Sequence, residues 1–115
     1  MIFSKKQLIL ASILTIHLAI ATTFVSATGT VEVYKSPTCG CCDKWVDHLR
    51  ENGFTVNTHD VGNKEARARA GISPTLGSCH TALVDGYAIE GHVPAQDIIR
   101  LLKERPKAVG IAVPD

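Results

Sequence analysis

Four cysteines are the residues of this chain whose chemistry is most readily recognised. Cys39, Cys41 and Cys42 lie within four positions of one another, and Cys79 lies far downstream. Cys39 and Cys41 form a C-x-C pair, which is typical of a site for a soft metal, whereas Cys39 and Cys42 form a C-x-x-C pair, which is typical of reversible disulfide chemistry. Both chemistries fit the local spacing, so the position of Cys79 in the fold has to discriminate between them.

The elements on either side of the three clustered cysteines follow from apolar periodicity. Residues 30–35 alternate as a strand does, and Ser36-Pro37 end that strand. Between about Cys41 and Asn52 the apolar residues recur at helical spacing, which predicts a helix with one buried stripe. That stripe consists of Cys42, Trp45, Val46 and Leu49. The cysteine loop would then lie at a helix N-terminus, where exposed N–H groups and the helix dipole favour an anion such as a thiolate.

The rest of the chain predicts a small α/β domain. Its further elements, in order, are a strand at 54–59, a short helix at 64–70, a strand at 81–84, a return strand at 87–90, a helix with Pro94 at its first position that ends before Pro106, and an extended tail at 107–115. The order β-α-β-α-β-β-α is that of a thioredoxin-like domain, with a central mixed four-stranded sheet flanked by helices.

This fold plan predicts where the side chain of Cys79 lies. In thioredoxin-like proteins the residue that enters the third strand packs against the loop after the first strand, and a cis proline normally occupies that place. Here Cys79 occupies it, so the fourth thiol is expected to point at the other three. Four convergent thiols favour a soft-metal site, and Cu(I) is the ion that thiolates select. Zn(II) fits less well, because C-x-C-C is not a usual zinc spacing.

The predicted metal ligands are therefore Cys39, Cys41, Cys42 and Cys79, with His80 as an additional candidate. Two other interpretations stay open. The protein could be a thiol–disulfide or copper oxidoreductase, with Cys39 as the nucleophile and Cys42 as the resolving thiol. Alternatively, the even number of cysteines could form structural disulfides in a small domain whose function lies on another surface.

The histidines are weaker candidates than the cysteines. Strand alternation would point His80 to the opposite face from Cys79. His92 lies in the loop before the last helix, where it could cap that helix or bind a ligand. The other conspicuous side chains are expected to be ordinary solvated or core residues: His48, His59, Trp45 and the charged residues of 64–69.

The N-terminus has the features of a secretory signal. Lys5 and Lys6 precede an almost unbroken apolar run at 8–20, and Val25-Ser26-Ala27 offers small residues for cleavage. We therefore expect a signal peptide at 1–27, a domain at 28–115 and a periplasmic or secreted protein without stable membrane association after cleavage. The alternative is an uncleaved N-terminal membrane anchor, for which the apolar run is short. Two of the twelve basic residues and none of the eleven acidic ones lie in the signal, so residues 28–115 have a net charge of −1. Nucleic-acid binding has no support from such a balance.

The chain also resembles a known family. The matching stretches are residues 33–42, Lys44-Trp45, His48-Leu49, residues 78–82, Gly86-Tyr87, residues 89–95 and residues 105–110. They resemble the CopG-type thioredoxin-like proteins of bacterial copper resistance, which are also catalogued as a domain of unknown function.

The resemblance implies a periplasmic domain that binds copper through Cys39, Cys41, Cys42 and Cys79. It implies a role in copper tolerance, by sequestering Cu(I) or by redox work on copper, alongside other periplasmic copper-handling proteins. Members of the family often continue into a methionine-containing tail. The only methionine of this chain is Met1, so no thioether ligand is expected from its C-terminal end.

Overall fold

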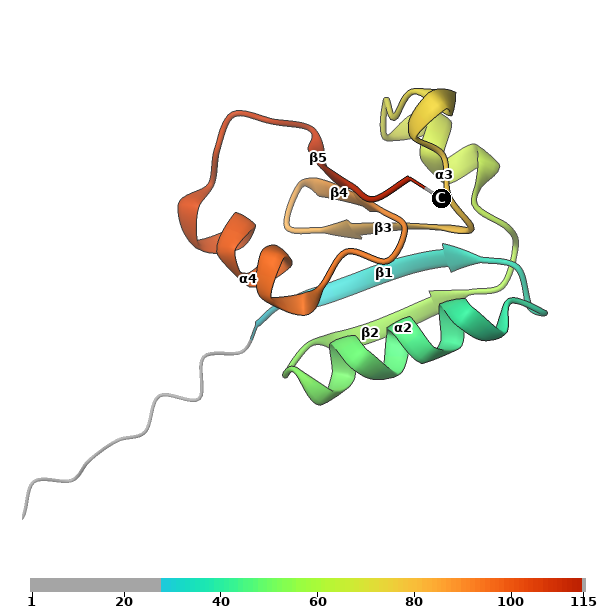
Figure 1. Ribbon diagram of the computed structural model, residues 1–115, viewed down its shortest axis with the longest axis horizontal. Coiled ribbons are helices and arrows are strands. Elements are labelled where there is room, and N and C mark those ends of the chain that lie inside the picture. Colours follow the sequence, from blue (N-terminus) through green and yellow to red (C-terminus); the bar gives the residue numbers. More distant parts are fainter. Residues whose placement is uncertain (1–27, 115) are drawn as a thin grey trace, which may run out of the picture.

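A computed structural model describes residues 28–114 as a sheet with its helices packed around it (Figure 1). The predicted signal peptide at 1–27 lies outside the described residues. The elements in chain order are β1 (Thr30–Lys35), α2 (Gly40–Glu51), β2 (Thr55–His59), α3 (Lys64–Arg69), the 3-10 turn η1 (Pro74–Leu76), β3 (His80–Val84), β4 (Tyr87–Glu90), α4 (Ala95–Glu104) and β5 (Gly110–Ala112). Among the described residues, no helix combines the length and apolarity that crossing a membrane requires.

The sheet confirms the predicted mixed α/β class, compatible with a thioredoxin-like fold. Its strand order is β2-β1-β3-β4-β5. β1 is parallel to β2 through the crossover helix α2, and β3 runs antiparallel to both β1 and β4. The sheet has one strand more than the predicted four, because part of the extended tail pairs with β4 as the parallel strand β5.

Helix α2 begins one residue earlier than predicted, at Gly40, and its buried stripe is the predicted one. Cys42, Trp45, Val46 and Leu49 are all buried. The last three join side chains of α4 and of the inward-facing strand positions in one hydrophobic core, which includes Val31, Val33, Ile89 and Ile98. Burial of this apolar stripe fixes α2 on the sheet and thereby places its N-terminus beside the end of β1.

Helix α4 differs slightly from the prediction at its start. Pro94 is the N-cap residue, with φ −60° and ψ 143°, and Ala95 is the first helical residue. The helix ends at Glu104, and Arg105, in the left-handed conformation (φ 50°), is its C-cap. The backbone N–H of Ala95 donates to Nε2 of His48 at 3.0 Å, so a side chain of α2 caps α4. His48 therefore has a structural role that its interpretation as a solvated residue did not include.

Strand β5 depends on one close approach. A Cβ at Gly110 would lie 1.6 Å from the carbonyl oxygen of Ala88, so only glycine allows the tail to reach β4 there. Beyond this contact, the backbone N–H of Val113 donates to the carbonyl of Glu90 at 2.9 Å. The tail thus covers the outer edge of β4, next to the segment that carries Cys79.

Candidate metal centre

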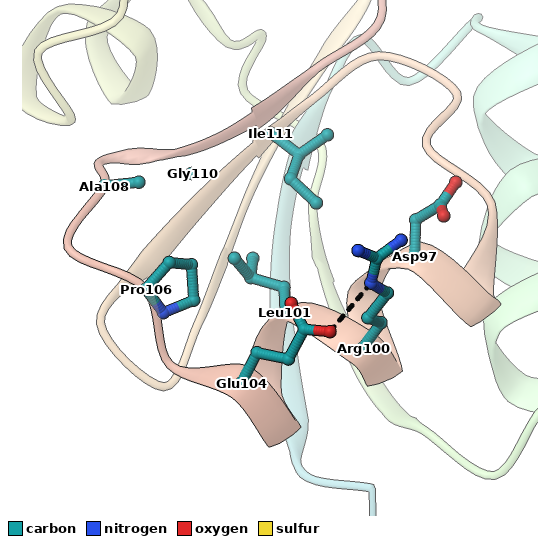
Figure 2. Close-up of a pocket in the computed structure, with 8 residues that line it drawn as sticks. All are labelled: Asp97, Arg100, Leu101, Glu104, Pro106, Ala108, Gly110 and Ile111. Carbon is teal, nitrogen blue, oxygen red and sulfur yellow. Dashed lines mark hydrogen bonds and ion pairs between the residues drawn. The ribbon is translucent and has the colours of Figure 1, made fainter.

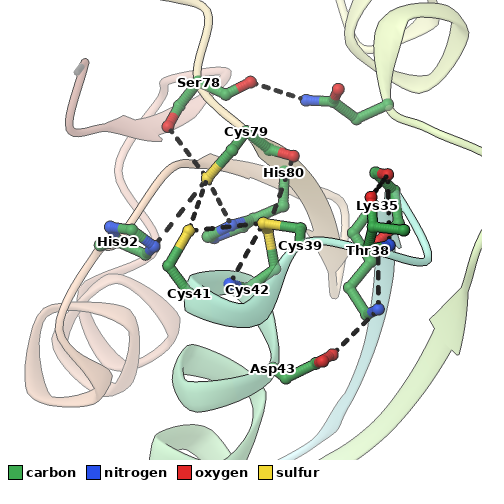
Figure 3. Close-up of a disulfide and its surroundings, with 12 residues drawn as sticks. Lys35, Thr38, Cys39, Cys41, Cys42, Asp43, Ser78, Cys79, His80 and His92 are labelled. Atoms are coloured by element: carbon green, nitrogen blue, oxygen red, sulfur yellow. Dashed lines mark hydrogen bonds and ion pairs between the residues drawn. A yellow bond between two sulfur atoms is a disulfide. The ribbon is translucent and has the colours of Figure 1, made fainter.

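The four cysteine sulfurs converge at the N-terminus of α2, and this arrangement matches the predicted one (Figure 3). Cys39 and Cys42 form a disulfide, whereas Cys41 and Cys79 keep their thiols. Sγ of Cys41 lies 3.4 Å from Sγ of Cys39 and 3.8 Å from Sγ of Cys79. All four sulfurs lie within 4.8 Å of one another, a span that one small metal centre can bridge once the disulfide is reduced.

The loop that carries the first three cysteines is held by short-range hydrogen bonds. The backbone N–H of Cys39 donates to the carbonyl of Ser36 at 3.3 Å, and the hydroxyls of Ser36 and Thr38 lie 3.1 Å apart. Cys39 is the N-cap of α2, and its sulfur accepts from the N–H of Cys42 at 3.3 Å. A sulfur in this position lies where helix N–H groups stabilise negative charge, which suits both a metal ligand and a redox thiol.

The cluster is buried on one side and open on the other. Cys42 is fully buried, and its sulfur lies 3.6 Å from the carbonyl oxygen of Cys79. Cys79 is half-buried, and Cys41 is exposed. A metal ion or a partner thiol can therefore reach the cluster through Cys41, while Cys42 anchors it to the core.

Lys35, at the end of β1, carries a buried positive charge directly before the cysteine loop in the chain. Its side chain is 4% exposed, and its Nζ lies 2.6 Å from a carboxylate oxygen of Asp60 and 3.0 Å from one of Asp43. Hydrogen bonds to Asp60 and then to Asp43 raise the pKa of Lys35 above its ordinary value. These two ion pairs join the end of β1, the first turn of α2 and the loop after β2.

Cys79 is held from behind by a buried carboxylate. Glu90 is fully buried, and one of its oxygens accepts from Nε of Arg67 and from the N–H of Ser78, both at 2.8 Å. Its other oxygen accepts from the hydroxyl of Thr81 at 2.6 Å. We call Glu90, Arg67, Ser78 and Thr81 the carboxylate clamp. It fixes the backbone on both sides of Cys79.

The clamp corrects one expectation about the charged residues of the chain. The charges of residues 64–69 were expected to form a solvated face, yet Arg67 turns inward to Glu90, and its Nη2 donates to the carbonyl of Ser78. Asn63 donates to the same carbonyl at 3.0 Å. The available signal was a glutamate that ends an apolar strand, because a carboxylate at a buried position requires a partner.

His80 lies closer to the cluster than strand alternation suggested. Its Nδ1 is 3.6 Å from Sγ of Cys79, because Cys79 precedes β3 and does not follow the alternation of that strand. The His80 ring is fully buried and stacks on Trp45, with ring centroids 4.2 Å apart. Its Nε2 lies 2.8 Å from the carbonyl oxygen of Gly91. Trp45 belongs to the core as expected and also orients this imidazole.

The other histidines differ in their distance from the cluster. Nε2 of His92 is 3.9 Å from Sγ of Cys79, and its exposed ring lies 5.1 Å from that of His80. His59 is remote from the cysteines, stacks on Tyr34 and pairs with Glu32 at 2.6 Å. A hydrogen bond from Asn57, together with that of His59, lowers the pKa of Glu32. The only sequence feature that pointed to a role for His92 near the site was its place in the loop before the last helix.

A separate pocket of about 340 Å³ lies between α4 and β5 (Figure 2). Leu101, Pro106 and Ile111 contribute apolar walls, and Arg100 pairs with Glu104 at its rim, with Nε and the carboxylate oxygen 2.9 Å apart. None of the four cysteines lines this pocket. Among the described residues, all four cysteines and two of the histidines, His80 and His92, lie together at the cysteine cluster.

The comparisons with known proteins agree with this geometry. The family described as "Protein of unknown function, DUF411" matches residues 76–115. No match was found among curated proteins. Two solved structures named copper resistance protein CopG, forms 1 and 2, are each 45% identical to the chain, with TM-scores of 0.68 and 0.69. The alignments cover 74% and 75% of this chain and 68% and 69% of those chains. On this identity and coverage, the chain belongs to the CopG-type copper resistance family.

Proposed function

We propose that the protein is a periplasmic copper-binding protein that holds Cu(I) in a thiolate cluster of Cys39, Cys41, Cys42 and Cys79 and contributes to copper resistance. The observation that carries the proposal is the convergence of four sulfurs within 4.8 Å of one another. The solved relatives are named copper resistance proteins, and thiolates select Cu(I) over harder ions.

The disulfide sets the condition for this binding. Reduction of the Cys39–Cys42 bond takes two electrons and two protons and yields two thiols beside the two that Cys41 and Cys79 already carry. The four thiols then lose protons as copper binds, since the thiolate is the ligand. Copper binding is therefore expected to be tight only in the reduced protein.

The location rests on the N-terminal segment. Lys5, Lys6 and the apolar run at 8–20 support export. The test is expression of the full chain followed by fractionation and mass measurement. A periplasmic protein that begins at Thr28 is the expected result, and retention of residues 1–27 in the membrane fraction would contradict it.

The binding test is an anaerobic Cu(I) titration of the reduced protein against a chromogenic chelator. We expect tight uptake of one or more Cu(I), weakened by Cys79→Ser because that sulfur completes the cluster. The matched control is Ser73→Ala, at an exposed residue outside the centre. Cu(I) uptake that survived replacement of all four cysteines would refute the proposal.

A second function has one specific observation in its favour. The Cys39–Cys42 disulfide lies at a helix N-terminus, with the Cys41 thiol in contact at 3.4 Å, which suits a thiol–disulfide or copper oxidoreductase. In the copper version, two Cu(II) accept two electrons from the reduced Cys39 and Cys42, which close their disulfide and release two protons. A reduced protein that neither converts Cu(II) to Cu(I) nor reduces insulin would exclude this function.

A further inference from the structure

The disulfide form leaves a second set of metal-binding atoms in place. Sγ of Cys79, a ring nitrogen of His80 and one of His92 lie within 4.8 Å of one another. Closing the Cys39–Cys42 bond removes neither the Cys79 thiol nor the two imidazoles. The question is whether these three atoms are arranged as ligands or only as neighbours.

The tautomer of His80 favours a ligand. Its Nε2 lies 2.8 Å from the carbonyl oxygen of Gly91, and a carbonyl can only accept, so Nε2 carries the hydrogen. In the neutral ring Nδ1 then holds a lone pair, and it is Nδ1 that faces the sulfur of Cys79 at 3.6 Å. Metal-binding histidines commonly donate their other N–H to a backbone carbonyl in this way.

The distances from the Cys79 sulfur to the two imidazole nitrogens fit tetrahedral coordination. With Zn–S about 2.3 Å and Zn–N about 2.0 Å, tetrahedral angles place sulfur and nitrogen roughly 3.6 Å apart. The sulfur of Cys79 is 3.6 Å from Nδ1 of His80 and 3.9 Å from Nε2 of His92. Sγ of the exposed Cys41, 3.8 Å from that of Cys79, is available for the fourth position, as is water.

The surroundings hold two of the three ligands in these positions. Trp45 stacks on the ring of His80, and its Nε1 donates to the carbonyl of Val93 at 2.8 Å, which ties down the loop that carries His92. The backbone N–H of Gly91 donates to the carbonyl of His80 at 3.2 Å. His92 itself is exposed, so an ion from solvent can reach the site and the ring can adjust to it.

We propose that the disulfide form binds one borderline divalent cation, such as Zn²⁺, through Cys79, His80 and His92. One sulfur and two imidazole nitrogens, with Cys41 or water in the fourth position, form a donor set of the kind that Zn²⁺ accepts, whereas the all-sulfur set of the reduced cluster favours Cu(I). Binding releases the proton of the Cys79 thiol and involves no electron transfer. The state of one disulfide would then decide which metal the same corner of the molecule accepts.

The experiment isolates this site with the Cys41→Ser variant. In that protein the Cys39–Cys42 disulfide is closed and one thiol, that of Cys79, should be titratable. Co²⁺ serves as a coloured probe under anaerobic conditions, followed by competition with Zn²⁺. We expect one equivalent of Co²⁺ to bind with a sulfur-to-cobalt charge-transfer band, and Zn²⁺ to displace it.

Matched histidine variants test the ligands in the same background. His92→Ala, at an exposed position, should lower Co²⁺ affinity at least about tenfold. Its circular dichroism spectrum should remain that of the folded protein. His59→Ala, which removes an imidazole remote from the site, should leave the affinity unchanged. Absence of a charge-transfer band in the folded protein, or an affinity that His92→Ala does not change, would overturn the proposal.

The proposal shares Cys79 with the copper cluster but does not rest on the proposed function. A reduced protein that takes up Cu(I), together with an oxidised Cys41→Ser protein that binds no Co²⁺, rejects the second site alone. The reverse pair of results rejects the copper cluster and leaves the Cys79–His80–His92 site standing.

Discussion

Two segments bring sulfur to the centre, and they are held in opposite ways. The loop from Ser36 to Cys42 is organised mainly by hydrogen bonds within three or four residues and is largely exposed. The segment Ser78-Cys79 is positioned by side chains 11 to 15 residues away, around a carboxylate with no exposed surface. The first segment is a local motif, whereas the second depends on the completed fold.

The contrast indicates which of the two segments can rearrange when the disulfide opens. A loop with local hydrogen bonds can rearrange as its disulfide opens, because water replaces each broken hydrogen bond at small cost. A buried charge network has no such freedom, because each group without its partner stays desolvated. We therefore expect the segment Ser78-Cys79 to keep its position when the disulfide opens, while the loop that carries Cys39, Cys41 and Cys42 moves relative to it.

The largest expected effect comes from breaking the carboxylate clamp. Glu90→Ala leaves Arg67 and the N–H of Ser78 without their acceptor, and loss of one partner of a buried pair costs about 3–5 kcal/mol. Urea unfolding measures this loss. Cu(I) affinity of the protein that remains folded should fall too, because Cys79 loses its support.

Two further variants serve as controls for that result. Glu90→Gln keeps an amide oxygen for both donors and should cost less than Glu90→Ala. Glu104→Ala removes a carboxylate from an exposed pair with Arg100 and should change the free energy of unfolding by about 1 kcal/mol or less. A clamp variant no less stable than Glu104→Ala would show that the contrast between the two segments is wrong.

An intermediate effect on the free energy of unfolding is expected at Lys35, which directly precedes the cysteine loop. Its carboxylate partners Asp43 and Asp60 are 60% and 50% exposed, so Lys35→Met leaves them in water, and we expect a loss of about 1 kcal/mol. The raised pKa of Lys35 gives this contribution a pH dependence. It is fully present below the unfolded pKa near 10.5 and is lost as the pH rises through the folded pKa.

Unfolding measured at neutral pH and at pH values above 10.5 checks the sign. The difference between the wild-type protein and Lys35→Met should shrink in the alkaline range. A difference that grew with pH would mean that Lys35 is not stabilised by Asp60 and Asp43.

The smallest effect is expected within the loop itself. Ser36→Ala removes an exposed hydroxyl whose hydrogen bonds within residues 28–114 go only to Thr38, at 3.1 Å to its hydroxyl and 3.4 Å to its backbone nitrogen. We expect a change of about 0.5 kcal/mol or less in the free energy of unfolding. A loss comparable to that of Lys35→Met would indicate that the loop is more tightly organised than its hydrogen bonds suggest.

The sequence predicted the local half of the centre better than the distant half. The cysteine loop and the buried stripe of α2 follow from spacing within about a dozen residues. The convergence of Cys79 was also expected, although only through the thioredoxin-like plan. These features needed no knowledge of side-chain packing.

The features that were missed depend on interactions between residues distant in sequence. Arg67 pairs with a residue 23 positions away, and the cap that His48 gives to Ala95 spans 47 positions. Strand β5 is three residues long and forms because Gly110 fits against Ala88. A weak local pattern cannot reveal a strand whose formation is decided by one close backbone approach.

The fit of Gly110 against Ala88 also has a consequence for the order of opening. Because β5 is short and lies at the edge of the sheet, it should detach before the central strands do. Amide hydrogens at Ile111 and Val113 would then exchange with solvent sooner than those of β3. The same fluctuation would break the hydrogen bond from the N–H of Val113 and expose the backbone carbonyl of Glu90 to solvent. The C-terminal strand therefore shields the backbone of Glu90, the residue that fixes Cys79, until it detaches.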